Sequence, residues 1–237
     1  MKTIGVIGGL GPQATIDFES RIHTVSQKLI KQYANRGYPP LVVYYLREAP
    51  MILAKDGSTP KNLEPEPKLL EAAKTLGAIA DFLVIASNTP HFFQEQIEAV
   101  SGKKVLSIVE VTLEEVKRRG LKKVGILAIG DTLKHQLYQN RLEQIGVAWE
   151  IPDKKVSRAL DKAIWAVMEG RKVGRFAEEP RHAAERGVTN LRYKQVKSII
   201  LGCTELPLLL GHWIKTSRDL INPNQLLAEA AVKCAIS

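Results

Sequence analysis

Cysteine and aromatic residues are scarce in this sequence, and long apolar runs are missing. The only thiols among the 237 residues are those of Cys203 and Cys234, and aromatic residues make up 6% of the chain. Two cysteines in a chain without a secretory signal do not suggest a disulfide framework, and neither has the spacing to a second ligand that zinc requires. No apolar run reaches the roughly 20 residues of a membrane span. We therefore expect a cytoplasmic protein that has no metal site and does not associate with membranes.

The net charge of +9 raises the question of nucleic-acid binding. Nearly all of the excess lies in residues 111–215, which hold 20 basic and 12 acidic side chains. These charges are scattered along helical stretches and lack the interleaved aromatic residues of a base-stacking surface. The pattern favours a solvated basic face that attracts small anions, and we expect no nucleic-acid partner.

Short apolar runs alternate with longer amphipathic stretches along the whole chain. The runs predicted as buried strands are residues 4–7, 41–46, 82–86, 105–109, 124–128 and 199–201, with a weaker candidate at 147–151. The stretches predicted as helices are residues 14–33, 67–76, 92–100, 111–119, 135–145, 156–168, 178–195 and 225–235. Alternation of continuous apolar strands with helices predicts an α/β fold with parallel sheets that are covered on both faces.

Similar segments recur in the two halves of the chain. Residues 2–8 are echoed by residues 122–128, and residues 83–89 by residues 199–205, at nearly equal separation in each half. The repetition predicts a duplicated lobe with a parallel sheet in each copy. Chance similarity between two pairs of buried strands is the alternative explanation.

The duplication suggests where the chain passes from one lobe to the other. The first lobe is predicted to comprise residues 1–110 and 216–237, and the second lobe residues 111–215. In this division the final helix returns to the first lobe, and Asn224 is placed to cap its N-terminus.

Ligands of parallel α/β sheets bind beyond the carboxyl ends of the strands, so the polar segments that follow the predicted strands are candidate sites. Residues 8–15, which include Gly9 and Leu10, follow the first strand and allow a tight turn before a helix N-terminus that favours anions. Their spacing differs from the G-x-G-x-x-G fingerprint, which argues against a nicotinamide-dependent dehydrogenase. The alternative is a tight turn that binds no ligand.

Ser87, Asn88 and His91 follow the strand predicted at residues 82–86. Small hydroxyl and amide groups at the end of a strand suit the binding of a carboxylate or an amine. Alternatively, Ser87 or Asn88 caps the next helix, and His91 is a structural residue.

Cys203 follows the matching strand of the second half and precedes Thr204 and Glu205. Cysteine is usually a small buried hydrophobic residue, but a helix N-terminus beside it would lower the pKa of its thiol toward neutrality. Glu205 is placed to accept a hydrogen bond from an ammonium group. Cys234, in the final predicted helix, is expected to be inert packing.

Three of these segments occur together in the order and spacing of a known family. Residues 8–15, 88–91 and 202–205 resemble the motifs of the aspartate/glutamate racemase superfamily, and the resemblance covers essentially the whole chain. It implies two Rossmann-like lobes related by a pseudo-twofold axis with a cleft between them, no cofactor, and a homodimer. It also implies inversion at an α-carbon by two cysteines, one from each lobe, that remove and return a proton on opposite faces of the substrate.

Carried over motif by motif, the resemblance assigns the main acid/base role to Cys203, with Ser87 in the opposing position and His91 as an auxiliary group. The substrate-binding residues that it implies are Gly9, Leu10, Arg47, Asn88, Thr89, Thr132, Thr204 and Glu205. Within that set Glu205 lies beside the substrate amine, and hydroxyl and amide groups hold the carboxylates. The expected partner is a small carboxylic acid or amino acid.

The sequence departs from the family pattern at three positions. Ser87 replaces the cysteine of the first lobe, and a hydroxyl is a much weaker base than a thiolate unless a neighbouring base activates it. Arg47 lies in a segment that differs from the family's Ile-Pro-Asp-Arg stretch, so it would approach the substrate from another angle. Met168 occupies the position of a lysine. Loss of these charged anchors favours a substrate with one carboxylate or a less polar side chain.

The leading interpretation is a cofactor-independent isomerase, an amino-acid racemase that moves the α-proton by means of Cys203 and Ser87. One alternative is one-sided chemistry such as decarboxylation, in which a single thiol protonates a carbanion. The other is a protein that binds carboxylates or amino acids and has lost turnover. A resemblance in fold does not choose between these functions.

Overall fold

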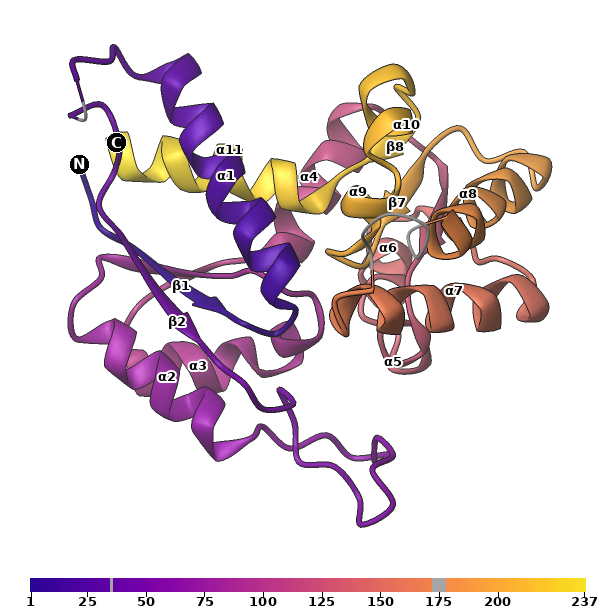
Figure 1. Cartoon of the computed structure of the whole chain (residues 1–237), viewed down its shortest axis with the longest axis horizontal. Helices are drawn as coiled ribbons and strands as arrows, with labels where there is room; N and C mark the ends of the chain where they lie inside the picture. Colours follow the sequence, from indigo (N-terminus) through magenta and orange to yellow (C-terminus); the bar gives the residue numbers. More distant parts are fainter. Residues whose placement is uncertain (35, 172–177) are drawn as a thin grey trace. The chain divides into compact units, whose positions relative to one another are not determined.

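The structure of the chain is a computed structural model that describes residues 1–34, 36–171 and 178–237. Strands and helices alternate along the sequence, as Figure 1 shows. In the described part of the chain, none of the helices combines the length and the apolarity that crossing a membrane requires.

Two compact units make up the described chain. The first comprises Met1–Val111 and Asn224–Ser237, and the second comprises Thr112–Pro223. The second unit continues past the boundary predicted at position 215, because β8 (Leu220–Ile221) pairs in parallel with β7 (Ile199–Leu201) of the same unit.

The first unit alternates strands with helices, as its sequence pattern predicts. Its elements are β1 (Ile4–Gly8), α1 (Pro12–Leu29), β2 (Leu41–Tyr45), α2 (Pro67–Gly77), β3 (Phe82–Ile85), the 3₁₀ helix η1 (Thr89–Phe93), α3 (Gln94–Ser101), β4 (Val105–Leu106), the start of α4 (Ile108–Arg118), and α11 (Pro223–Ile236). In Figure 1 the yellow helix α11 runs beside the indigo helix α1, and α2 lies next to α3.

The second unit repeats this alternation around β7 and β8. Its other elements are the rest of α4, β5 (Lys123–Leu127), α5 (Gly130–Lys134), α6 (Gln139–Gln144), β6 (Ala148–Glu150), α7 (Lys154–Met168), α8 (Glu178–Tyr193), α9 (Leu206–Leu209) and α10 (Gly211–Thr216). The helices α7 and α8 pack side by side (Figure 1).

Each unit is built on a four-stranded parallel sheet, which confirms the predicted α/β fold class. The strand orders are β2-β1-β3-β4 in the first sheet and β6-β5-β7-β8 in the second. If the strands of each unit are counted from its own start, the same order occurs twice, as the predicted duplication requires. The central strands β1, β3 and β7 are apolar and buried along their whole length, which is typical of parallel sheets covered by helices on both faces.

The register of the central strands is also repeated. Ile7 of β1 pairs with Ile85 of β3 in the first sheet, and Leu127 of β5 pairs with Leu201 of β7 in the second. In each sheet these are the last residues through which the two central strands pair with each other. The two sheets therefore end at corresponding points.

Equivalent backbone hydrogen bonds extend this correspondence by one residue. Ala86 donates its N–H to the carbonyl oxygen of Ile7 at 3.0 Å. In the second unit Gly202 donates its N–H to the carbonyl oxygen of Leu127 at 2.8 Å. Ser87 follows Ala86 directly, and Cys203 follows Gly202. Each therefore occupies the same position within its own unit, just beyond the carboxyl end of a central strand.

An apolar core lies in each unit between the sheet and its helices. In the first unit Ile85 belongs to one cluster with Leu76 of α2. In the second unit Leu201 belongs to one cluster with Leu160 of α7 and Val188 of α8. Full burial of an aliphatic side chain of this size stabilises a fold by roughly 1.5–3 kcal/mol, so these cores hold the strand ends in place.

The strand predicted for residues 105–109 is shorter than its apolar run suggests. β4 ends at Leu106, and α4 begins at Ile108. Between them, the Ser107 hydroxyl accepts a hydrogen bond from the N–H of Glu110 at 3.5 Å, as an N-cap residue does. The Ser-x-x-Glu spacing is that of a capping box, and this local signal outweighs the apolar run.

Two predicted helices differ from the structure in their continuity. Within the helix predicted for residues 135–145 only α6 is helical, because Gln136 has a φ of 57°, in the left-handed region that interrupts a helix, and α5 ends before this range. The helix predicted from residue 92 is preceded by η1. The short helices α9 and α10 have no counterpart in the prediction, because they are too short to show a helical period.

Asn224 is not the N-cap of the last helix, because α11 begins one residue earlier, at Pro223. Proline is favoured in the first turn of a helix. The side-chain amide of Asn224 instead donates a hydrogen bond to the Asp17 carboxylate at 3.2 Å, which joins α11 to α1. Near the other end of α11, the N–H of Lys2 donates to the carbonyl oxygen of Ala235 at 2.8 Å.

Candidate functional site

Cys203, Thr204 and Glu205 form a buried polar cluster beyond the carboxyl end of β7. Their exposed fractions are 6%, 4% and 3%. The Cys203 thiol donates a hydrogen bond to Oε2 of Glu205, with Sγ 2.9 Å from this oxygen, and the Thr204 hydroxyl donates to the same oxygen at 3.3 Å. Three residues that the sequence predicts to be functional are therefore joined in one hydrogen-bonded group.

The glycine before Cys203 lies in a closely packed position. A Cβ atom at Gly202 would lie 3.0 Å from the Cβ of Ala128 and 3.4 Å from a ring carbon of Tyr138. A side chain at this position would therefore require these neighbours to shift by a few tenths of an ångström. The Gly-Cys pair in the sequence is thus explained by the approach of β7 to β5 and to this ring.

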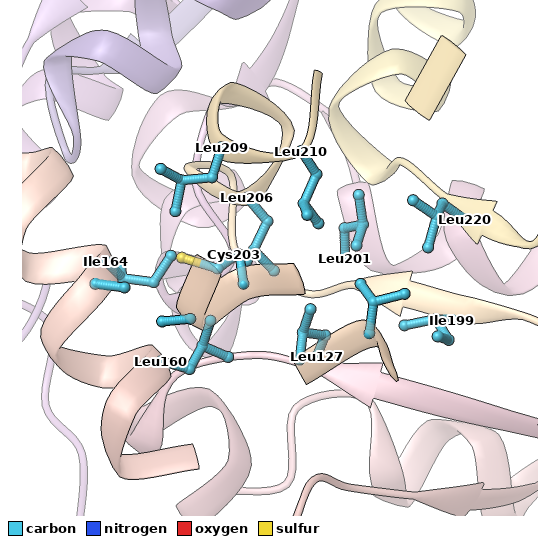
Figure 2. Packing of buried hydrophobic residues seen from close by; sticks show 14 of the residues in the cluster. Leu127, Leu160, Ile164, Ile199, Leu201, Cys203, Leu206, Leu209, Leu210 and Leu220 are labelled. Carbon is cyan, nitrogen blue, oxygen red and sulfur yellow. The ribbon is translucent and has the colours of Figure 1, made fainter. Parts of the chain in front are cut away.

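The sulfur of Cys203 lies at the edge of an apolar cluster. Figure 2 shows it next to Leu160 and Ile164 of α7, with Leu206 of α9 also close by. An apolar wall on one side of the sulfur and a carboxylate on the other give the thiol two very different neighbours.

These surroundings raise the pKa of the Cys203 thiol well above its ordinary value. Burial is the main cause, and the Glu205 carboxylate adds to it through its charge and by accepting the thiol hydrogen bond. The prediction that this pKa falls toward neutrality is therefore wrong. The charges near the thiol are carboxylates, and the helix that follows, α9, has only four residues.

Burial also raises the pKa of the Glu205 carboxyl group, although hydrogen bonds from Cys203 and Thr204 act in the opposite direction. Both members of the thiol–carboxylate pair therefore hold a proton more tightly than they would in water. Two such groups joined by a hydrogen bond are suited to pass a proton from one to the other.

Two residues of the segment after β5 are almost completely buried. Thr132, which the sequence predicts to bind substrate, is 1% exposed. The side chain of Tyr138 is fully buried, and the pKa of its hydroxyl is raised chiefly by burial and in part by the charge of Cys203. The sequence does not single out Tyr138, because a tyrosine in a predicted helix reads as ordinary core.

Asp161 of α7 is a further acid near the thiol that the sequence does not single out. Its Oδ1 accepts a hydrogen bond from the N–H of Gly130 at 3.1 Å, which ties α7 to the turn after β5. Its negative charge contributes to the raised pKa of Cys203. Burial and the charge of Asp131 in turn raise the pKa of the Asp161 carboxyl group. In the sequence it looks like an ordinary polar residue of an amphipathic helix.

In the first unit, Ser87 and Asn88 are buried beyond the end of β3, with exposed fractions of 9% and 4%. Thr89 follows and begins η1. Because Ser87 and Cys203 are equivalent in their units, Thr89 takes the place that Glu205 takes in the second unit. The first unit thus offers hydroxyl groups where the second offers a thiol and a carboxylate.

The ring of His91 uses both nitrogen atoms in hydrogen bonds. Nδ1 lies 3.2 Å from the carbonyl oxygen of Asn88, and Nε2 accepts the N–H of Ile108 at 3.2 Å. Nδ1 therefore carries the proton in this arrangement, and burial lowers the pKa of His91 to about 4. Because neither nitrogen is left to accept a proton from Ser87, the geometry favours the structural interpretation of His91.

Protonation of His91 is expected to destabilise the fold in weak acid. Its pKa is about 4 in the folded protein and about 6.5 in an unfolded chain. The neutral ring therefore stabilises the folded state by about 3 kcal/mol above pH 6.5, and this contribution is lost as the pH falls from 6.5 to 4. The free energy of unfolding in urea should fall more between pH 7.5 and 4.5 for the wild type than for His91→Gln. Equal decreases in the two proteins would contradict this expectation.

Gly9 and Leu10 follow β1 in a turn that is held by contacts within the unit. Gly9 has a φ of 80°, and a Cβ atom there would lie 2.5 Å from the carbonyl oxygen of Leu46, so only glycine fits. Its N–H donates to the hydroxyl of Thr15 at 2.9 Å. Leu10 packs against the apolar core of the unit. The N–H of Gly9 is thus engaged within the protein, as the structural interpretation of this turn expects.

Arg47 is exposed immediately after Leu46, at the end of β2. Its guanidinium carbon lies 5.2 Å from the centroid of the Tyr45 ring, within reach of a cation–π interaction. Because β2, β1 and β3 are neighbours in the sheet, Arg47 follows the same sheet edge as Gly9 and Ser87. The first unit therefore gathers its predicted site residues at the carboxyl ends of three adjacent strands.

A groove of about 850 Å³ runs along α7 and α8. Its walls carry six basic side chains and one acidic side chain, which are Lys154, Lys155, Arg158, Lys162, Arg171, Arg186 and Glu179. Asp161 does not contribute to these walls, and neither does the polar cluster of Cys203, Thr204 and Glu205. Much of the positive excess of the second unit thus lines a groove to which the thiol does not contribute.

Metal-binding side chains do not gather in the part of the chain that the structure describes. Within residues 1–34, 36–171 and 178–237, no group of three or more histidine, cysteine, aspartate or glutamate residues is placed to hold a metal ion.

Comparison with known proteins identifies relatives over the full length of the chain. A family model described as Asp/Glu/Hydantoin racemase matches residues 7–231. The broad specificity amino-acid racemase RacX of Bacillus subtilis (strain 168) is 25% identical over 235 residues, which cover 97% of this chain and 96% of the relative.

Solved structures show the same fold. The aspartate racemase of Picrophilus torridus superposes with a TM-score of 0.80 at 25% identity, covering 99% of this chain and 94% of that chain. The glutamate racemase of Francisella tularensis subsp. tularensis SCHU S4, solved in complex with D-glutamate, has a TM-score of 0.66 at 15% identity, covering 99% and 81%. The second likeness concerns the fold alone.

Proposed function

The chain belongs to the Asp/Glu/hydantoin racemase family, and we propose that it is a cofactor-independent amino-acid racemase in which Cys203 is the main acid/base and Ser87 stands in the place of the second thiol. The observation that carries this proposal is the equivalence of Ser87 and Cys203. Ser87 follows β3 and Cys203 follows β7, which are equivalent strands in two sheets of identical order. Each residue lies one position beyond an equivalent backbone hydrogen bond. Inversion of a carbon centre requires two groups of this kind, since a planar carbanion must be approached from both faces.

The proposed chemistry begins with formation of the Cys203 thiolate. The thiol proton moves along the 2.9 Å hydrogen bond to Oε2 of Glu205, which gives a thiolate and a carboxylic acid with no change in total charge. The thiolate then takes the α-proton of the substrate. A new S–H bond forms as the Cα–H bond breaks, and the electron pair is delocalised into the substrate carboxylate. Ser87 then delivers its hydroxyl proton to the opposite face as the new Cα–H bond forms, and its alkoxide and the protonated Glu205 return to their starting states by exchanging one proton each with water.

The other binding roles follow from the same family pattern. We propose that Asn88, Thr89 and Thr204 bind the substrate carboxylate and that Glu205 lies beside the substrate amine. Thr132 contributes a further hydroxyl from the second unit. Gly9, Leu10 and Arg47 would contact the substrate from the sheet edge of the first unit. The expected ligand is a free amino acid.

The proposal is tested by incubating the protein with a panel of amino acids in D₂O. Loss of the α-proton signal in proton NMR identifies a substrate and a working base, and chiral chromatography of the same samples then detects the opposite enantiomer. We expect both. Absence of exchange across the panel of proteinogenic amino acids would overturn the proposed racemase function.

One-sided chemistry is the second candidate, and the hydrogen bonding of His91 favours it. If no base activates Ser87, a single thiol can still remove or deliver a proton on one face. In that case the α-proton exchanges with deuterium while the starting enantiomer is retained. A malonate-type acid would release carbon dioxide instead. The NMR and chiral measurements together separate these outcomes from racemisation.

A further inference from the structure

Five cations line the groove along α7 and α8 without a partner of opposite charge. They are Lys154, Lys155, Arg158 and Lys162 of α7 and Arg186 of α8. Within residues 1–34, 36–171 and 178–237 none of the five forms a salt bridge, whereas Arg21, Arg118 and Arg192 are each paired with a carboxylate. The sequence between Arg171 and Glu178 contains no acidic residue. The groove therefore gathers positive charge that the protein itself does not compensate.

The acidic residues next to these cations in the sequence are engaged elsewhere. Asp161 is the only acidic residue within α7, and it accepts the N–H of Gly130 at 3.1 Å and does not line the groove. Asp153, at the N-cap position of α7, pairs with Lys194 at 2.9 Å. Among the described residues that line the groove, Glu179 of α8 is the one acid. An anionic ligand would therefore meet an excess of positive charge.

The positions of these cations act against the stability of α7 itself. Lys154 and Lys155 are its first two residues, where the positive end of the helix dipole repels cations. Lys154, Arg158 and Lys162 follow one another at intervals of four residues, which places like charges side by side on one face of the helix. Local arrangements that reduce stability are expected at functional sites, so the basic face of α7 is a candidate for such a site.

The buried part of the groove lining consists of small side chains. Ala163 and Ala166 of α7 and Ala183 of α8 line it with exposed fractions of 4%, 9% and 3%, and Pro180 of α8 is buried as well. Because these side chains are short, the space between the two helices stays open over about 850 Å³. Sites for small molecules have volumes of about 300–1,000 Å³, so the groove has the size of a ligand site.

Trp165 adds a flat aromatic surface to the groove. It is 54% exposed and follows Lys162 by three residues, about one helical turn, so the cations of α7 all lie on its N-terminal side. Cations in succession suit a chain of phosphate groups, and an exposed indole face suits stacking with a planar base. One ring is enough for a single base, whereas a nucleic-acid strand calls for a series of rings. The lining therefore matches a small ligand with phosphates at one end and a base at the other.

We propose that the groove along α7 and α8 is a second ligand site, which binds a chain of phosphate groups, and that a nucleoside triphosphate is the ligand that uses all of its lining. The four cations of α7 and Arg186 of α8 bind the phosphates, and the base stacks on Trp165. Inorganic triphosphate has the phosphate chain without the base, so it isolates the contribution of the cations. This inference does not depend on the proposed racemase function, because Cys203 does not line the groove.

Calorimetric titration of ATP and of inorganic triphosphate into the full chain, at about physiological ionic strength, tests the role of the cations. Both ligands should bind, and the Arg158→Glu, Lys162→Glu double variant should bind each of them at least about tenfold more weakly. The Lys117→Glu, Lys197→Glu double variant changes the net charge by the same amount at exposed positions outside the groove, and it should keep the wild-type affinities. Equal losses of affinity in the two double variants would show attraction to the net charge alone and would overturn the proposal.

The Trp165→Leu variant tests the contact with the base. ATP should bind to the wild type at least about fivefold more tightly than inorganic triphosphate, and Trp165→Leu should remove this advantage without changing the affinity for triphosphate. Equal affinities of the two ligands for the wild type would overturn the stacking of a base on Trp165. Failure of both ligands to bind would overturn the site itself. A hexaglutamate peptide or a single-stranded oligonucleotide that binds more tightly than ATP would assign the groove to a macromolecule and would also overturn the proposal.

Discussion

Replacing Cys203 by alanine is expected to reduce α-proton exchange by at least about 10³-fold, because the variant loses the acid/base group that contacts the α-carbon in the proposed mechanism. The side chain is small and buried, and the alanine leaves only a cavity of about one sulfur atom in the apolar cluster around Leu160 and Ile164. The fold should therefore survive the substitution. Proton NMR in D₂O with the best substrate of the panel measures the loss.

Cys234 provides the matched control for this experiment. It is the other free cysteine of the chain, lies in α11, and is only partly buried. Cys234→Ala removes the same atom from the same residue type and should leave the exchange rate unchanged. Exchange that continues at the wild-type rate in Cys203→Ala would rule out this thiol as the catalytic base, whatever the behaviour of the control.

Replacing Ser87 by cysteine is expected to raise the rate of racemisation by about 100-fold. A thiol ionises and carries a proton far more readily than a hydroxyl, and His91 does not compensate at this position because both of its nitrogen atoms are already engaged. The change adds one sulfur atom in place of oxygen at a site that is 9% exposed. Chiral chromatography of the product over time measures the rate.

Ser87→Ala is the control for this second experiment, because it removes the hydroxyl and adds nothing. If Ser87 delivers the proton, its alanine variant should lose racemisation while exchange with retention of configuration through Cys203 continues. A cysteine at this position that leaves the rate unaltered would show that a second thiol is not what limits the reaction. If Ser87→Ala racemises the substrate as fast as the wild type, Ser87 has no part in the mechanism.

The sequence contains enough information to predict the two parallel sheets, since their strands are short apolar runs at regular intervals. It also places Ser87 and Cys203 at corresponding points, because the segments around them repeat. The limits of β4 and the existence of β8 are harder to predict. Strands of two residues carry no period, and whether Val109 joins a strand or a helix depends on the cap at Ser107.

The electrostatics of the site depend on contacts between residues that are far apart in the chain. Asp161 reaches the N–H of Gly130, 31 positions earlier, and His91 accepts the N–H of Ile108, 17 positions later. Neither contact leaves a local pattern. The sign of the change in the Cys203 pKa was also inaccessible, because it depends on which way Glu205 points and on how completely the surrounding cluster excludes water. Motif position predicts which residues take part, whereas packing decides their charge state.

The return of residues 224–237 to the first unit has a consequence for the order in which the molecule can be made. During translation the whole of the second unit leaves the ribosome before α11, and α11 buries Leu227, Ala231 and Val232 completely. A nascent chain that has reached Pro223 already contains both sheets, but its first unit still presents the apolar surface that α11 covers. The second unit is therefore expected to complete its folding before the first unit, which is the reverse of the usual N-terminal-first order. A product that stops short of α11 would carry an exposed apolar face that marks it for chaperones and proteases.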